Sequence, residues 1–326
     1  MSPAERLEAV LHGRRPDRAP VSFWHHFNAE QFAGPAAVKA HIDHLNAYDL
    51  DFLKIMNDNG YPHGHRVEAV DDLRALSALR GDEMRFAEQL ELIAALRRET
   101  GGRVPLITTL FNAWATLRHM IREPSPVKRP PNLDASQDQP SNRIKELIAE
   151  DFEAVRGALR TIGSSLANFA GRCLDAGADG VFLSVRDDWV CDGADRSLYE
   201  QLLRPSDLNI LAGASAGRFN MLHVCGRPVD LRAFADYPVG AINWADRAGG
   251  PAISEIAGWD GPAICGGVDN LSTLPEGTPD DCRREARDAL RQAGDRPMII
   301  APGCTYDPAR VPSANLYAIC REVRGE

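Results

Sequence analysis

Short apolar runs alternate with longer amphipathic stretches along most of the chain. Eight runs of five to nine residues, most of them rich in Val, Ile, Leu or Phe, are bounded by Gly, Pro or Asp. This pattern is typical of buried parallel strands. The expected strands cover residues 20–24, 51–56, 103–111, 180–185, 220–225, 240–244, 262–268 and 297–303.

The amphipathic stretches between these runs predict helices. The clearest patterns cover residues 83–99, 144–177 (long enough for two helices) and 279–294. Strand-like runs that alternate with helices predict an α/β protein, a single eight-stranded β/α (TIM) barrel over residues 1–326. A doubly wound open sheet is the main alternative. It would usually carry a glycine-rich phosphate turn after its first strand, whereas the sequence there is FWHHF.

Two segments lie outside this alternation. Ser2 and Glu5 form a capping box with Pro3 at the first helical position, and Gly13 is a suitable stop. An extra N-terminal helix is therefore expected before the first strand. Residues 122–142 are dense in Pro, Ser, Asp and Asn, and a loop of that length in a compact domain is either a lid or a disordered segment.

Composition narrows the classes of function. The formal charge of −9 argues against a nucleic-acid binder, because phosphate neutralisation needs a basic face. No run reaches 18 apolar residues, and the first residues lack the apolar core of a signal peptide, so we expect no membrane span. Seven cysteines, an odd number, do not suggest a disulfide scaffold. Together these features favour a reducing cytoplasm.

Polar residues follow each expected strand. In a β/α barrel the chemistry lies at the carboxyl ends of the strands, so these positions are candidates for a site. Helix N-caps and loops also favour Asp and Asn, which explains part of the set but not its histidine and cysteines. The candidates are Trp24, His25, Asn57, Asp58, Arg186, Asp187, Trp189, His223, Cys225, Asp269 and Cys304.

The most informative of these residues are His223 and Cys225 in the run MLHVCG. Side chains alternate along a strand, so a histidine and a cysteine two positions apart share one face. Cys304 lies 79 residues further on, after the last expected strand, and closure of a barrel could bring it across the mouth. Zinc prefers such ligands and leaves one position open when it is catalytic. The plainer interpretation, a core histidine and cysteines that act as small hydrophobic residues, stays open on spacing alone.

Longer motifs resemble a known family over nearly the whole chain. They are AERLEAVLHGRRPDRAPV, DFLKIMNDNG, ADGVFLSVRDDW, LYEQLLRPSDLNIL, LHVCG, INWADRAGG, ICGGVDNLSTLPEGTPDDCRREARDAL and MIIAPGCTYDPARVPSANLYAI. The chain resembles members of the uroporphyrinogen decarboxylase superfamily. The resemblance implies a β/α barrel with its site at the mouth, in agreement with the expected strands.

That superfamily has two chemistries. The decarboxylases use no metal and rely on an aspartate after the second strand, whose position Asp58 matches, and on an arginine-bearing N-terminal segment. The alkyltransferases, such as the methylcobalamin:coenzyme M methyltransferases, bind zinc through His-x-Cys and a later Cys. His223, Cys225 and Cys304 match those ligands, and no arginine lies between Arg18 and Arg66. The sequence therefore resembles the methyltransferase branch.

The expected activity follows from this resemblance. Zinc would convert an acceptor thiol into a thiolate, the nucleophilic form, which would attack an activated methyl or other alkyl group. Three carboxylates are candidates for a catalytic role, as a fourth ligand or a partner of His223: Asp58, Asp187 and Asp269. The candidates for substrate binding are Trp24, His25, Asn57, Arg186 and Trp189.

The resemblance also suggests binding partners, and two alternative functions have to be considered. A small-molecule thiol or methyl donor is the expected substrate, with a corrinoid such as methylcobalamin, carried by a separate protein, as one donor. A homodimer is an option that the resemblance adds. The first rival is a decarboxylase of a tetrapyrrole in which His223 and Cys225 are incidental. The second is a barrel that binds a ligand without catalysis.

Overall fold

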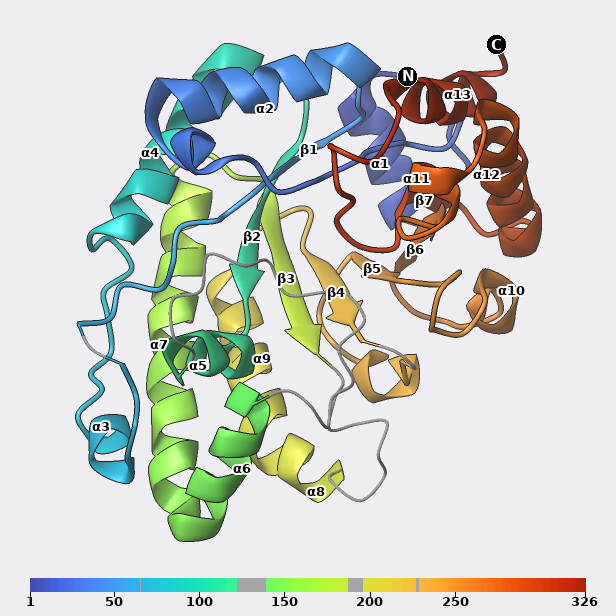
Figure 1. Cartoon of the computed structure of the whole chain (residues 1–326). Helices are drawn as coiled ribbons and strands as arrows, with labels where there is room; N and C mark the ends of the chain where they lie inside the picture. Colours follow the sequence, from blue (N-terminus) through green and yellow to red (C-terminus); the bar gives the residue numbers. More distant parts are fainter. Residues whose placement is uncertain (65, 122–138, 187–195, 227–228) are drawn as a thin grey trace.

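A seven-stranded parallel sheet forms the centre of the molecule (Figure 1). The computed structural model describes residues 1–64, 66–121, 139–186, 196–226 and 229–326. Each strand pairs with the next one along the chain. The strands are β1 Leu53–Ile55, β2 Leu106–Phe111, β3 Gly180–Arg186, β4 Met221–Cys225, β5 Ala241–Trp244, β6 Ala263–Val268 and β7 Met298–Pro302.

The prediction of eight strands is not confirmed, because the run at 20–24 is not a strand. It forms an isolated parallel bridge between Val21 and Ile300 of β7. The Val21 carbonyl accepts from the Asp51 amide at 2.9 Å, so the run still lies between the two edges of the sheet. The Val21 amide, however, donates to the Asp51 carboxylate at 2.8 Å, and Pro20 has no amide hydrogen to donate. Two backbone N–H donors that a strand would contribute to the hydrogen bonds of the sheet are thus missing.

Helices follow most strands, as expected for parallel β/α units. The capping box at Ser2 begins α1, and Asp151 caps the start of α7, which divides the stretch 144–177 into two helices as predicted. Residues 122–138 of the expected lid lie outside the described part, and its last residues begin α6. The helices are α1 Pro3–Leu11, α2 Gly34–Tyr48, α3 Val70–Arg74, α4 Arg85–Thr100, α5 Ala113–Ile121, α6 Gln139–Glu150, α7 Phe152–Asp175, α8 Arg196–Leu198, α9 Arg204–Gly213, α10 Ile253–Ile256, α11 Thr273–Glu276, α12 Pro279–Ala293 and α13 Ser313–Arg324, with a π-helix at Tyr199–Leu203 and short 3₁₀ helices at Ala29–Gln31 and Leu231–Phe234.

Two apolar layers pack on the sheet. The larger fills the space between the strands and the surrounding helices. The smaller lies on the inner face and includes Trp24, Phe182 and Met221. Leu7 and Val10 of α1 belong to this inner layer, so the extra N-terminal helix contributes to it. Among the helices of the described residues, none combines the length and apolar character needed to cross a membrane.

One buried carboxylate ties α1 to the sheet. Asp51 is 1% exposed and accepts from Arg6 of α1 at 2.5 Å and from Arg18 at 2.6 Å. The same carboxylate accepts from the Val21 amide. Asp51 thus fixes the segment that leads to the expected site residues Trp24 and His25.

We expect Asp51→Asn to lower the free energy of unfolding by about 3–5 kcal/mol, because it removes the buried charge that pairs with both Arg6 and Arg18 and leaves Arg6 only the more exposed Asp17. Urea denaturation of wild type and variant measures this difference. Asp43→Asn is the matched control, since it breaks an ion pair with Lys39 whose side chains are both exposed, and such pairs contribute little. A loss for Asp51→Asn no larger than that for Asp43→Asn would contradict this role.

Candidate metal centre

Strand β4 presents His223 and Cys225 on the inner face of the sheet. Leu222 and Val224 belong to the outer apolar layer, whereas Met221 belongs to the inner layer. Because side chains alternate along a strand, His223 and Cys225 face the same way as Met221. His223 is 3% exposed and Cys225 is half-buried, at the carboxyl end of the strand.

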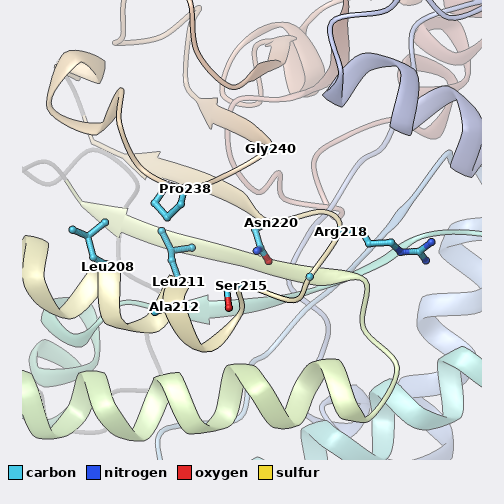
Figure 2. A pocket seen from close by; sticks show the side chains of 9 residues that line it. Leu208, Leu211, Ala212, Ser215, Arg218, Asn220, Pro238 and Gly240 are labelled. Carbon is cyan, nitrogen blue, oxygen red and sulfur yellow. The ribbon is translucent and has the colours of Figure 1, made fainter.

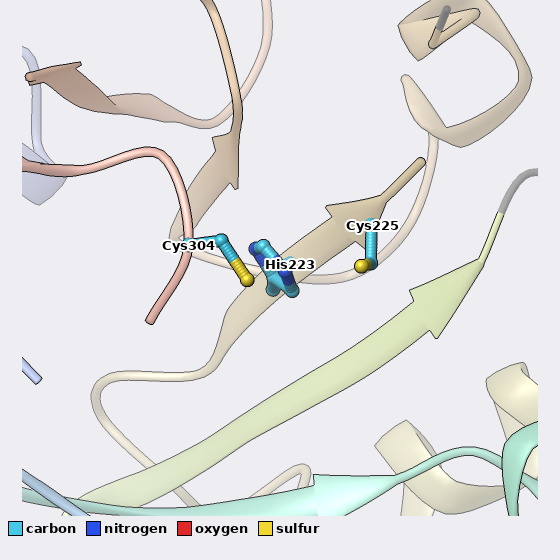
Figure 3. A group of neighbouring side chains, drawn as sticks. All are labelled: His223, Cys225 and Cys304. Carbon is cyan, nitrogen blue, oxygen red and sulfur yellow. The ribbon is translucent and has the colours of Figure 1, made fainter. Parts of the chain in front are cut away.

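Cys304 reaches the same place from the loop after β7. Gly303 allows this path, because a Cβ at that position would lie 2.6 Å from Cα of Ala245. Figure 3 shows Cys304 pointing toward the His223 ring, with Cys225 further along β4. The ligand atoms of the three residues all lie within 4.8 Å of one another.

Asn243 fixes the orientation of the histidine. It is fully buried on β5, in register with His223. Its Nδ2 donates to the carbonyls of Cys265 and Pro302, at 2.9 and 3.1 Å. Its Oδ1 therefore remains the acceptor for His223 Nδ1, at 2.6 Å. That bond places the ring proton on Nδ1 and leaves the Nε2 lone pair for a ligand.

The two cysteines influence each other's ionisation. The hydrogen bond from Cys225 lowers the pKa of Cys304 to about 6, with further help from the amide and hydroxyl of Thr305 and the charge of Lys54. The same hydrogen bond, together with burial, raises the pKa of Cys225. The hydrogen bond between the two sulfurs thus favours the thiolate form of Cys304 and the thiol form of Cys225.

This donor set fits a zinc ion. Sulfur and imidazole ligands on a tetrahedral zinc lie less than about 4 Å apart, so the three atoms need to close by only about 1 Å. Three protein ligands leave one position for a water or a substrate, which is the catalytic arrangement rather than the structural one. No other group of three such residues within the described ranges comes this close.

The predicted carboxylates lie in different places. Asp58 pairs with Nδ1 of His26 at 2.5 Å. Asp269 accepts from the Leu271 amide at 2.8 Å and from the Ser272 hydroxyl at 2.5 Å, so its oxygens cap a loop. Neither belongs to the His/Cys/Cys group. Asp187 lies outside the described residues, as does Trp189 of the substrate-binding set.

The remaining predicted residues surround the group without joining it. Trp24 is 2% exposed and packs on Phe182 in the inner layer, which is a core position. The His25 ring lies against Tyr306, and Arg186 pairs in register with Cys225 at the end of β3.

Asn57 has the one feature of this set that suggests a ligand. It is 8% exposed, and its Oδ1 is buried without a hydrogen-bond partner in the described part of the protein. Native proteins rarely leave such an acceptor unsatisfied, so the atom is available to a ligand.

Two residues that the sequence analysis missed complete the surroundings. Asn243 is a single polar residue in the apolar run GAINW, and Lys54 is a single cation in the run DFLKIM. A lone polar residue in a buried strand needs a partner, and that requirement was the signal available in the sequence.

A hollow lies at the amino ends of the strands, away from the His/Cys/Cys group (Figure 2). Its lining includes Asn220 and Gly240, which immediately precede β4 and β5, and part of α9. The Asn220 amide is fully used, since it accepts from the Val181 amide and donates to the Ala214 carbonyl. In parallel α/β folds ligands bind at the carboxyl ends, where the His/Cys/Cys group lies.

These features define a parallel α/β protein with a candidate metal centre at the carboxyl ends of its strands. Residues 45–325 match the family model described as uroporphyrinogen decarboxylase (URO-D), and the chain belongs to that family. The resemblance found in the sequence is thereby confirmed. No curated protein is significantly similar to the chain in sequence.

One solved structure with a high TM-score shares the fold, and a second one superposes less well. A methyltransferase from Methanosarcina mazei is 18% identical and superposes with a TM-score of 0.76, over 100% of this chain and 99% of that one. A B12-independent methionine synthase from Shewanella sp. W3-18-1 is 13% identical, with a TM-score of 0.47, over 72% of this chain and 66% of that one.

We expect Asn243→Ala to weaken zinc binding by about 10–100-fold, because His223 loses the acceptor that fixes its tautomer. A competition titration against a coloured zinc chelator measures the affinity. Asn315→Ala is the control, because Asn315 is also buried and donates to two carbonyls, of Leu274 and Gly277, far from His223 in the sequence. Equal zinc affinity in the two variants would contradict the role of Asn243.

Proposed function

We propose that this protein is a zinc-dependent alkyltransferase that transfers a methyl group to or from a metal-activated thiol. The observation that carries the proposal is the His223, Cys225 and Cys304 group, in which the ligand atoms lie within 4.8 Å of one another and the bond of Nδ1 to Asn243 leaves the Nε2 lone pair directed to the sulfurs' side of the ring as a ligand. Membership in the URO-D family and a fold shared with a methyltransferase support it.

The residues of the candidate site would have distinct roles. A bound zinc ion supplies Lewis acidity that keeps a sulfur ligand deprotonated at neutral pH. Nε2 of His223 and the two sulfurs would hold the ion, and Asn243 keeps the imidazole aligned. The two cysteine thiolates would balance the charge of a divalent ion, which favours delivery of a nucleophilic sulfur over polarisation of a carbonyl.

Asp58 and His26 supply a proton acceptor at the rim. The Asp58 carboxylate holds His26 through Nδ1, the arrangement in which an aspartate orients a catalytic histidine. The segment that carries His26 is joined to the loop of Cys304, because the Tyr306 amide donates to the Trp24 carbonyl at 3.4 Å. We propose that His26 Nε2 receives the proton that the substrate thiol loses.

The rival within the same family is a metal-independent decarboxylase. It is favoured by Asp58, which matches the decarboxylase aspartate by position. A substrate with many carboxylates needs converging cations, and the sequence has no arginine between Arg18 and Arg66. Lys39 in that interval pairs with Asp43, and Lys54 is enclosed in the core.

We expect one zinc ion per wild-type chain, measured by elemental analysis after removal of loosely bound metal. His223→Ala and Cys304→Ala should each lose it, since two remaining ligands hold zinc weakly. Cys173→Ala is the matched control, because Cys173 is a buried cysteine of α7 outside the group.

Treatment with a chelator tests whether the activity depends on the zinc ion. Removal of zinc should abolish methyl transfer, and its return should restore it. A wild-type protein without stoichiometric zinc, or variants at 223 and 304 that both retain it, would contradict the proposal. A decarboxylase would keep its activity in the chelator.

A further inference from the structure

Lys54 is a cation in the inner apolar layer. Its side chain leaves β1 toward the rings of Trp24 and Phe182, and the residue is 3% exposed. Nζ lies 2.9 Å from Sδ of Met56, 4.3 Å from the centroid of the Phe182 ring and 5.7 Å from that of Trp24. Within the described ranges, no carboxylate or carbonyl forms a hydrogen bond or an ion pair with this ammonium.

Such a position is unfavourable for an ammonium group. Transfer of a charge into an apolar layer destabilises the folded state by several kcal/mol unless a partner offsets it. Burial correspondingly lowers the pKa of Lys54 to about 7. Sulfur and aromatic faces offset only part of that penalty. A methionine would fill the same space without this desolvation penalty, so the charge of Lys54 is the property that needs an explanation.

Two groups favour the Lys54 ammonium through their charge. They are Cys304 of the candidate metal centre and Asp58, which pairs with His26. The interaction is mutual, since the Lys54 charge also lowers the pKa of Cys304.

An aromatic ring connects Lys54 to the metal ligands. Nζ lies over the Phe182 ring, and that ring stacks on the imidazole of His223 at 5.3 Å and 22°. Lys54 pairs in register with Ile107, and Ile107 pairs with Gly180, whereas His223 pairs with Ser184 further along β3. The Lys54 backbone is therefore nearer the amino ends of the strands than that of His223. The Phe182 ring between the ammonium and the imidazole is apolar, so the field of the charge is weakly screened.

We propose that Lys54 is a positioning residue whose buried charge makes the metal centre prefer an anionic sulfur ligand over a neutral one. The inference rests on the proposed function, because it needs a metal ion held by His223, Cys225 and Cys304. Two cysteine thiolates neutralise a divalent ion, so a third thiolate leaves the centre with one negative charge. The Lys54 ammonium offsets that charge, whereas a neutral ligand gains nothing from it.

The test compares two ligands on the zinc-loaded protein. The probes are 2-mercaptoethanol, which binds a metal as a thiolate, and imidazole, which binds without charge. Lys54→Met and Lys54→Gln are two neutral variants, so that one poorly folded protein does not end the experiment. Thr109→Val is the control, because Thr109 is another buried polar residue of the neighbouring strand β2 and its replacement leaves Lys54 in place.

We expect the neutral variants to retain one zinc ion per chain and to bind 2-mercaptoethanol at least about tenfold more weakly. Their affinity for imidazole, and both affinities of Thr109→Val, should stay within about twofold of wild type. An unchanged preference, or an equal loss for both ligands, overturns the role of Lys54 and leaves the metal centre intact. A wild-type protein that binds no zinc instead overturns the proposed function.

Discussion

The hydrogen bond between His223 Nδ1 and Asn243 Oδ1 links the register of the sheet to the orientation of a candidate metal ligand. It exists because β4 and β5 pair in a register that places the two residues side by side. The Asn243 amide is in turn held by carbonyls of β6 and β7. Four neighbouring strands thus determine which nitrogen of one imidazole is free. A ligand oriented by so many elements needs little rearrangement to bind an ion.

The charged groups of the site differ in how deeply they are buried. At the rim, Asp58 and His26 pair in contact with solvent. At the candidate metal centre, the hydrogen bond from Cys225 lowers the pKa of Cys304. An aromatic ring separates the imidazole from the Lys54 ammonium. The charge of Lys54 lowers the pKa of Cys304 further, so the buried cation and the sulfur pair both favour an anionic sulfur.

The sequence predicted local features well and contacts between distant segments less well. His223 and Cys225 followed from the period of a strand, and seven runs of apolar residues became strands. The run at 20–24 is also apolar, but the Asp51 carboxylate takes the Val21 amide and only an isolated bridge to Ile300 remains. Trp24 was expected at the pocket, yet the inner layer encloses it. Asn243 could not be assigned, because its role depends on the register between strands, which composition does not encode.

X-ray absorption spectroscopy of the zinc-loaded protein tests the central claim most directly, because it reports the atoms bound to the ion. Two sulfurs at about 2.3 Å and an imidazole nitrogen at about 2.0–2.1 Å are expected. A first shell composed only of nitrogen and oxygen would place the ion elsewhere in the molecule and contradict the account.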